Sequence, residues 1–281
     1  MSLSAKALAR LPYVDAIVNY LAPTEEKPCR HAYDLPQSLP YGNVRDEPHR
    51  VPIYDARSVA DFLSLDDEGL QFVRHKTSVR DFLDEAEVKR VYYPETEKLV
   101  ADATGARWVF VFDHTVRQRI YGIADRTPGA PRQPALSVHN DYTELSAPQR
   151  VRELTGKAAD ALLRRRFAVI NVWRPIRGPL YDAPLAVCDA NSMQPHDLVA
   201  ADLMYRDRVG ETYAVKYNPS HRWLYISAML PNEALLLKCY DSRRDGIARF
   251  APYTAFEDPS APADRLTQES IEVNTLAFFA D

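Results

Sequence analysis

The chain contains 281 residues with a mass of 31.9 kDa, of which 46% are hydrophobic and 26% charged, proportions that are ordinary for a soluble globular protein. Its formal charge of −4 and its pI near 6.0 offer no basic surface for nucleic acid or for an anionic membrane. Apolar runs fall short of the roughly 18 residues of a membrane span, and the N-terminus lacks a secretory signal pattern, so we expect a cytoplasmic protein.

Two common kinds of site are not predicted. The three cysteines, Cys29, Cys188 and Cys239, are too few and too scattered for a disulfide framework or a Cys-x-x-Cys zinc site. The sequence contains neither a GxGxxG nor a Walker motif, and 9 glycines stand against 21 prolines. The sequence therefore does not predict a nucleotide-binding loop.

The first half of the chain predicts helices and strands around a long irregular arm. Apolar residues spaced for one helical face mark the helices, alternation marks the strands, and clustered prolines mark the arm. The predicted elements are a helix over 1–22, a surface arm over 22–52, strands over 53–59, 69–77 and 108–113, and a helix over 79–104.

The second half begins with a strand that holds His139 and a helix over 151–166. Many short strands separated by turn residues are typical of a sandwich or barrel. We therefore predict a mainly β fold with α additions, a double-stranded β-helix (jelly roll, cupin-like) with helices packed on its outer sheet. It forms a single domain over 1–281, with an N-terminal helix and arm (1–52) before the core (53–281). The strand-like runs are 167–174, 184–188, 197–203, 211–217, 222–226, 233–240 and 271–279.

The stretch Leu136-Ser-Val-His139-Asn-Asp141-Tyr-Thr143 carries a chemical signal. In a strand, alternate side chains share a face, so His139 and Asp141 point the same way. An imidazole and a carboxylate, completed by a later histidine, form the facial triad of non-haem Fe(II) oxygenases. Because the chain has seven histidines, a His-x-Asp pair also arises readily by chance, and a solvated pair on a turn is the alternative.

A facial triad needs a third ligand from a later part of the chain. Of the two histidines there, His196 in Gln-Pro-His-Asp has the surroundings of a turn residue. His221 opens a later strand, where the fold can bring it beside the motif. We therefore predict His139, Asp141 and His221 as the metal ligands.

Several motifs in this order resemble one family. They are similar to the family that contains the small cephamycin-methoxylase-associated protein and the fungal hydroxylase/desaturase and meroterpenoid endoperoxidase enzymes. The motifs are Phe112-Asp-His-Thr-Val-Arg117, Val138-His-Asn-Asp-Tyr-Thr143, Ile170-Asn-Val-Trp-Arg-Pro175, Pro184-Leu-Ala-Val-Cys-Asp189, His221-Arg-Trp and Met229-Leu-Pro-Asn-Glu-Ala-Leu-Leu-Leu-Lys-Cys-Tyr-Asp-Ser242.

The resemblance extends from residue 50 to the C-terminus. It implies a jelly-roll Fe(II)/2-oxoglutarate-dependent dioxygenase that uses O2, acts on a small-molecule natural product and forms a homodimer. Carried over by position, it puts the iron ligands on His139, Asp141 and His221, the same residues that the spacing favours.

Near its end the sequence departs from the family pattern. Pro252-Tyr253-Thr-Ala-Phe256 stands where the family commonly has Pro-His-Thr-Ala-Phe, and Gln268 and Asn274 stand where it commonly has arginines. If either arginine binds the distal carboxylate of 2-oxoglutarate, this chain needs another cation or another co-substrate.

Three residues are candidates for holding the co-substrate. Lys238 lies inside an apolar run, where an unpaired ammonium is costly, so it should meet an anion: the co-substrate, or a structural partner such as Glu233 or Asp241. Arg174 offers a planar fork that grips a carboxylate, with a structural salt bridge as the alternative. Asn171, on the same strand, is placed to hydrogen-bond a bound acid.

The sequence leaves three functions open. The first is an Fe(II)/2-oxoglutarate oxygenase that hydroxylates, desaturates or cyclises a small molecule. The second is an iron oxidase that needs no 2-oxoglutarate because its substrate binds the metal, which Gln268 and Asn274 would permit. The third is a catalytically silent partner subunit of the same fold.

Overall fold

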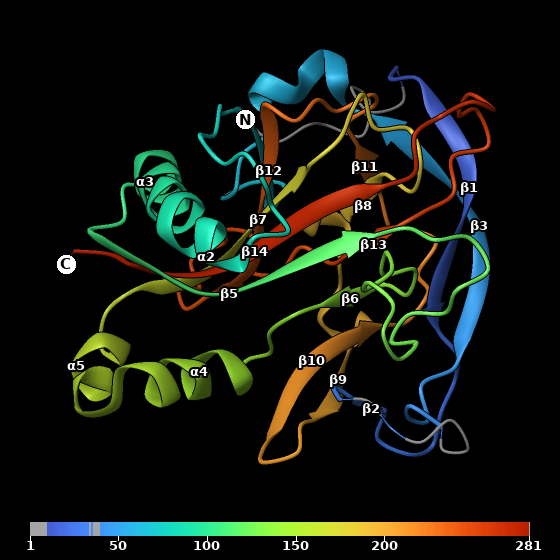
Figure 1. Cartoon of the computed structure of the whole chain (residues 1–281). Helices are drawn as coiled ribbons and strands as arrows, with labels where there is room; N and C mark the ends of the chain where they lie inside the picture. Colours follow the sequence, from blue (N-terminus) through green and yellow to red (C-terminus); the bar gives the residue numbers. More distant parts are fainter. Residues whose placement is uncertain (1–9, 34, 36–39, 281) are drawn as a thin grey trace.

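The computed structural model describes residues 10–33, 35 and 40–280, which form two β-sheets with helices on one side (Figure 1). The nine-stranded sheet contains, in spatial order, β1 (Tyr13–Leu21), β3 (Asp46–Asp55), β11 (Trp223–Tyr225), β8 (Leu185–Cys188), β13 (Tyr253–Ala255), β6 (His139–Asn140), β10 (Val209–Val215), β9 (Leu198–Met204) and β2 (Cys29–His31). The five-stranded sheet contains β4 (Leu70–Arg74), β12 (Glu233–Asp241), β7 (Phe167–Pro175), β14 (Glu269–Phe278) and β5 (Trp108–Gln118).

The helical segments are short. They are η1 (Arg57–Phe62), α2 (Glu85–Glu87), η2 (Val88–Tyr92), α3 (Tyr93–Thr104), α4 (Ser146–Thr155), η3 (Gly156–Ala158), α5 (Ala159–Leu163), η4 (Ala190–Ser192) and η5 (Pro195–Asp197). None of the helices in the described part of the chain has the length and apolar content that a membrane span needs. The predicted mainly β fold with helices on an outer sheet is confirmed.

The central strands of the five-stranded sheet are buried on both faces, which explains their continuous apolar sequences. Every residue of β7 and β12 is buried. On one face Val169 and Leu235 pack in the core between the two sheets. On the other face Ile170 and Leu236 pack in a cluster with Val100 of α3. Helix α3 therefore covers the outer face of this sheet.

The helix predicted over 79–104 begins at Glu85 and ends at Thr104. The Asp84 side chain accepts hydrogen bonds from the backbone amides of Ala86 and Glu87, which would otherwise lack partners. Gly105 adopts φ of 72°, a left-handed conformation that ends the helix without the steric cost of a Cβ atom.

The N-terminal prediction was wrong from residue 13 onward. The segment predicted as a helix forms strand β1, which pairs with β3 in antiparallel register. Ala16, Val18 and Tyr20 are buried while Ile17 is 42% exposed, so the burial follows the two-residue period of a strand. The predicted arm over 22–52 contains β2 and most of β3. Residues 1–9 lie outside the described residues.

The helix predicted over 151–166 is divided in the structure. Gly156 adopts φ of 51° and follows α4, and the chain continues through η3 into α5. These two helices lie at one end of the molecule (Figure 1), where Ala147, Val151 and Ala159 belong to the same buried cluster as residues of β7 and β12.

The two sheets pack face to face through a shared apolar core. Trp173 and Leu237 from the five-stranded sheet and Val187 and Leu224 from the nine-stranded sheet belong to the same buried cluster. Part of this interior is polar, because Asn171 and Glu272 of the five-stranded sheet are also buried there. This polar part of the interior holds the His139 motif.

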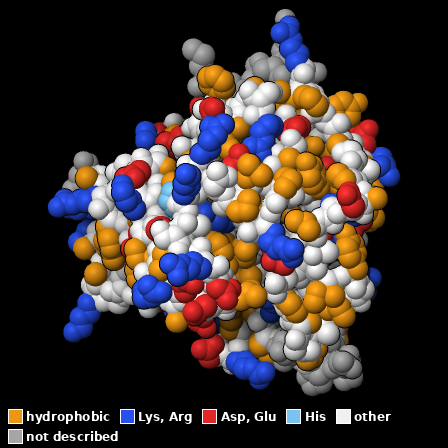
Figure 2. Space-filling model, turned by 45° about the horizontal axis from the view of Figure 1, so that its top comes forward, with side chains coloured by type: hydrophobic (Ala, Val, Ile, Leu, Met, Phe, Trp, Pro, Cys, Tyr) orange, Lys and Arg blue, Asp and Glu red, His pale blue; other side chains and the backbone are white. Residues whose placement is uncertain are grey.

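On the face of the molecule shown in Figure 2, basic, acidic and hydrophobic side chains are interspersed. This mixture agrees with the small net charge of −4.

Candidate active site

His139 and Asp141 lie side by side at the end of β6. The Nε2 atom of His139 is 3.5 Å from Oδ1 of Asp141. The Nδ1 atom of His139 lies 2.9 Å from the carbonyl oxygen of Ser137, to which it donates in the tautomer that leaves the Nε2 lone pair facing Asp141. The predicted pairing of these two side chains on one face is therefore present.

Asn171 of β7 connects Asp141 to the five-stranded sheet. Its Nδ2 atom lies 2.9 Å from Oδ2 of Asp141, 2.6 Å from Oε1 of Glu272 and 3.0 Å from the hydroxyl oxygen of Tyr253. Its own Oδ1 atom is buried and has no hydrogen-bond partner. Three oxygen atoms from three different strands or loops thus converge on one amide group.

Tyr253 spans the space between the two sheets. Its backbone lies directly opposite His139 in the register of β13 and β6, and the two rings have their centroids 4.7 Å apart. Its hydroxyl group donates to Oε1 of Glu272 at 2.6 Å, across the interior. The phenol therefore reaches from the nine-stranded sheet to β14 of the five-stranded sheet.

Glu272 is a site residue that the sequence analysis missed. It lies on β14 in an alternating series of polar residues, Gln268, Ser270, Glu272 and Asn274, within an otherwise apolar segment. Side chains at alternate positions share a face, so this pattern could have indicated a polar stripe on the inside of the barrel.

The electrostatics of the cluster favour a bound cation. Burial and the neighbouring charge of Asp141 raise the pKa of Glu272 to about 7. Burial also raises the pKa of the Tyr253 phenol and lowers the pKa of His139. Within the residues that the structure describes, no ion pair joins a Lys or Arg to Asp141 or Glu272. Arg117, which lines the same small cavity as Glu272, opposes this rise in the pKa of Glu272 through its positive charge, although it forms no ion pair with either carboxyl group.

The cavity beside this cluster is small. Arg117, Trp173, Tyr253, Gln268 and Glu272 contribute to its wall. Its volume of about 10 Å³ holds about one water molecule. His139 and Asp141 are not among the residues that line it, and their side chains are 23% and 25% exposed.

A larger hollow of about 400 Å³ lies between β5 and the helical segment that precedes it. Phe82, Tyr93, Phe112 and His114 are among its lining residues. The hydroxyl group of Tyr93 lies 2.8 Å from Nδ1 of His114. None of the residues that line this hollow belongs to the His139 cluster.

The third predicted ligand, His221, does not join the other two. Its Nε2 atom lies 3.1 Å from Asp197, its Nδ1 atom lies 3.2 Å from the hydroxyl group of Tyr20, and its ring stacks on Tyr20. Strands β8 and β13 separate β11, which follows His221, from β6. In the described residues no group of three or more His, Cys, Asp or Glu side chains is arranged to hold a metal ion. The assignment of His221 is therefore corrected.

The comparisons with known proteins identify the family. A family model described as an oxidoreductase/YMDC permease-like domain matches residues 18–278. The hydroxylase/desaturase efuI of Hormonema carpetanum is 36% identical over 253 residues, which cover 82% of this chain and 84% of the relative. The Fe(II)/2-oxoglutarate-dependent dioxygenase nvfI of Aspergillus novofumigatus is 33% identical over 243 residues, which cover 84% and 85%. The chain belongs to this oxidoreductase family.

A solved structure supports the same assignment. The iron and alpha-ketoglutarate-dependent endoperoxidase NvfI superimposes with a TM-score of 0.86 at 28% identity, over 97% of this chain and 100% of that chain. The resemblance inferred from the motifs is thereby confirmed.

The donors at the His139 cluster fit a hard divalent cation such as Fe(II). They comprise one imidazole, one carboxylate and one phenol, which are oxygen and nitrogen ligands suited to iron, and the carboxyl group of Glu272 accepts a hydrogen bond from the phenol. They do not include a second histidine, because Tyr253 stands at the position next to His139. The cluster therefore fits a metal ion, but not the ligand set predicted from the sequence.

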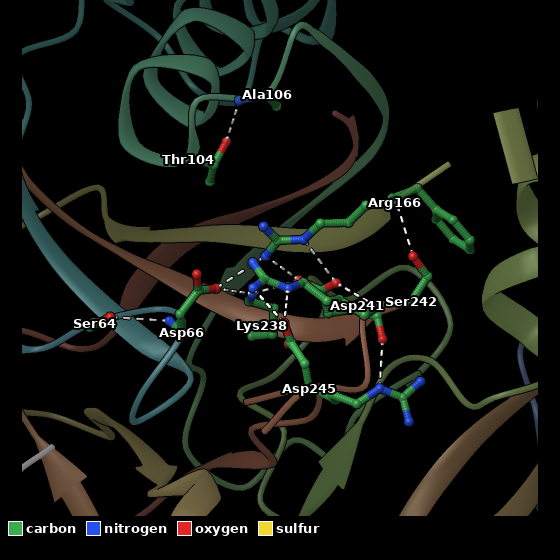
Figure 3. A network of polar contacts seen from close by, with 12 residues as sticks. Ser64, Asp66, Thr104, Ala106, Arg166, Lys238, Asp241, Ser242 and Asp245 are labelled. Carbon is green, nitrogen blue, oxygen red and sulfur yellow. Dashed lines mark hydrogen bonds and ion pairs between the residues drawn. The ribbon is translucent and has the colours of Figure 1, made fainter. Parts of the chain in front are cut away.

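Lys238 is held by structural partners (Figure 3). Its Nζ atom lies 2.7 Å from Asp66 and 2.8 Å from Asp241, and Arg166 also pairs with Asp241. The expectation that this buried ammonium meets an anion was right. The anion belongs to the protein, so the assignment of Lys238 to the co-substrate is corrected.

Arg174 also lies away from the cluster. Its guanidinium group contacts Nδ1 of His75 at 2.7 Å and lies over the ring of Tyr92, which belongs to the helical layer. On β7, neighbouring side chains point to opposite faces, so Arg174 faces outward where Trp173 faces the core. Of the three predicted co-substrate residues, only Asn171 lies at the site.

Proposed function

We propose that this chain is a non-haem iron oxidoreductase that oxidises a small-molecule natural product by hydroxylation, desaturation or oxidative cyclisation. The observation that carries the proposal is the 3.5 Å approach of His139 Nε2 to Asp141 Oδ1 beside the polar part of the barrel interior. Membership of the family adds support, because relatives are named as Fe(II)/2-oxoglutarate-dependent dioxygenase and hydroxylase/desaturase.

The residues of the chain have separate tasks in this proposal. His139 and Asp141 hold Fe(II), which supplies the chemistry of O2 activation with 2-oxoglutarate as co-substrate. Asn171 fixes the orientation of Asp141 through its hydrogen bond of 2.9 Å, and the Ser137 carbonyl fixes the His139 ring. Trp173, in the wall of the small cavity, excludes water from the reacting centre.

A second candidate function is a catalytically silent partner subunit. Tyr253 replaces the histidine that the family motif predicts, and Gln268 and Asn274 replace two arginines. Gln268 donates to Ser270 at 2.7 Å, and its Oε1 atom and the Oδ1 atom of Asn274 are buried without partners. The replacement of the two arginines also permits an iron oxidase that does not use 2-oxoglutarate, because its substrate binds the metal instead.

One experiment separates these functions. Metal-free protein is loaded anaerobically with Fe(II), and bound iron is measured after desalting. Oxygen is then added with and without 2-oxoglutarate, and succinate and CO2 are measured. Stoichiometric iron with succinate formation supports the oxygenase, and iron with O2 consumption but no need for 2-oxoglutarate supports the oxidase. Failure to retain iron supports the silent subunit.

The matched controls are single substitutions. His139→Ala removes a proposed ligand and should abolish iron retention. His221→Ala removes the histidine that lies elsewhere and should leave iron retention unchanged. Equal iron retention by His139→Ala and the unaltered chain would refute the proposed site.

The predicted homodimer and the cytoplasmic location are also part of the proposal. Size-exclusion chromatography with light scattering tests the homodimer, because a dimer has twice the chain mass of 31.9 kDa. A tagged chain that fractionates with cytoplasmic markers tests the location.

A further inference from the structure

We propose that Tyr253 supplies the third protein ligand, so that the metal centre of this chain is built from His139, Asp141 and Tyr253. The inference rests on the proposed function, since it requires that the chain binds iron. It concerns the one position at which this chain departs from the histidine of the family motif.

Strand order selects Tyr253 for this role. Of the strands that follow the motif, β10 and β13 are the neighbours of β6. In the register of β13 and β6, Tyr253 is the residue paired with His139. Residues paired directly across antiparallel strands have their Cβ atoms about 4.5–5.5 Å apart, which suits two ligands of one ion. The 4.7 Å distance between the two ring centroids indicates that both side chains turn to the same face.

The position of the hydroxyl group supports the assignment. Tyr253 Oη and Asp141 Oδ2 both accept hydrogen bonds from Nδ2 of Asn171. Both oxygens are therefore neighbours of one buried atom, and the other oxygen of Asp141 faces His139 Nε2 at 3.5 Å. The imidazole, the carboxylate and the phenol thus surround one small region.

The phenol also has a route for its proton. If Tyr253 held the metal as a phenolate, its proton would pass to Oε1 of Glu272, which already accepts the hydrogen bond from this hydroxyl group at 2.6 Å. The phenolate and Asp141 would then supply the negative charges at the ion, and Glu272 would be neutral. No other reactant is needed.

The experiment uses the colour of iron-bound tyrosinate. A phenolate bound to Fe(III) transfers charge to the metal and gives a broad visible absorption band, which imidazole and carboxylate ligands do not produce. The full chain is loaded anaerobically with one equivalent of Fe(II), oxidised in air and desalted, and bound iron and the visible spectrum are recorded together.

The expected result is a visible band that scales with bound iron. Tyr253→Phe should abolish this band and lower the affinity for Fe(II) about tenfold or more. Tyr253→His should abolish the band but retain iron, because an imidazole replaces the phenol. The control is Tyr225→Phe, a buried tyrosine of β11, which should keep the band.

Two outcomes would overturn the inference, and they differ in what they say of the proposed function. Stoichiometric iron without a band, or a band that survives in Tyr253→Phe, removes Tyr253 from the metal and leaves the iron enzyme standing. Absence of bound iron in the unaltered chain overturns both. Thermal unfolding of each variant shows whether it is folded. If Tyr253→Phe does not fold, Tyr253→His still decides the test, because it should lose the visible band while it retains iron.

Discussion

Replacing Lys238 with methionine tests whether this residue serves the fold or the co-substrate. The side chains of Lys238 and Asp241 are 2% and 0% exposed, and their charged groups are 2.8 Å apart. Removing one partner of a buried ion pair costs about 3–5 kcal/mol, because the other charge stays buried. Arg166 still pairs with Asp241 and Asp66 is 48% exposed, so we expect the lower end, about 3 kcal/mol.

The assay is urea unfolding at pH 7, followed by tryptophan fluorescence. The matched control is Lys89→Met, which breaks a pair with Glu85 of similar length, 2.6 Å, between side chains that are 55% and 70% exposed. Exposed pairs of this kind contribute little to stability, because water and salt screen both charges. Lys238→Met should therefore lower the free energy of unfolding several times more than Lys89→Met.

The effect of Lys238→Met should also depend on pH. Burial alone would raise the pKa of Asp66, but the hydrogen bond and charge of Lys238 outweigh it and lower the pKa. A lowered carboxyl pKa contributes stability at pH values above the unfolded pKa, and this contribution disappears as the pH falls through the folded pKa. The difference between the unaltered chain and Lys238→Met should therefore shrink below about pH 4.

The opposite result would restore the interpretation made from the sequence. If Lys238→Met unfolds at the same urea concentration as the unaltered chain but binds 2-oxoglutarate more weakly, then Lys238 binds the co-substrate and the structural argument is refuted.

Three further predictions concern other parts of the molecule. Glu272→Gln should stabilise metal-free protein at high pH. The folded pKa of Glu272 is raised from 4.5 to about 7. The stability that the protonated Glu272 contributes is therefore complete below the unfolded pKa and is lost as the pH rises through 7. The advantage of the variant should grow between pH 5 and pH 8 to at most about 3 kcal/mol, as measured by urea unfolding; a constant difference would contradict this. His221→Ala should lose about 2–3 kcal/mol, since it removes two hydrogen bonds, to Asp197 and Tyr20, together with a buried ring that stacks on Tyr20. The variant should retain iron where His139→Ala does not; loss of iron in both would return His221 to the site. Gly69→Ala should lower stability by about 1–3 kcal/mol, because Gly69 has φ of +81° and an added Cβ would lie 2.6 Å from a neighbouring methyl group. The control is Gly122→Ala, because Gly122 has φ of +80° but open space around it. The difference between the two variants measures the cost of the clash without that of the backbone strain.

The elements that were predicted correctly are those whose hydrophobic pattern alone distinguishes a strand from other structures. β7 and β12 are buried on both faces, so their continuous apolar runs identify them. β13 was missed because it has only three residues and directly follows Pro252, which marks a turn or loop more often than a strand. β1 was mistaken for a helix because short apolar runs fit either period, and only its pairing with β3 separates the two.

The same distinction applies to the site. The His139–Asp141 pair depends on alternation within one strand, which is visible in the sequence. The third ligand depends on which distant strand lies next to β6, and chain order alone does not reveal this. Both β11 and β13 follow the motif, but only β13 is its neighbour. Chain order therefore favoured His221, and the sheet order favours Tyr253.

The departures from the family motif belong to one structural change. Tyr253, Gln268 and Glu272 line the same small cavity, so a substitution at one position alters the space and the charge available to the others. A histidine at position 253 is too short to reach Glu272, and the hydrogen bond that now crosses the interior would be lost. An arginine at position 268 would add a second cation, beside Arg117, to the cavity that Glu272 lines, and would oppose the sharing of a proton with the phenol. With Tyr253 and Gln268 in place, Arg117 is the basic residue that lines this cavity beside Glu272.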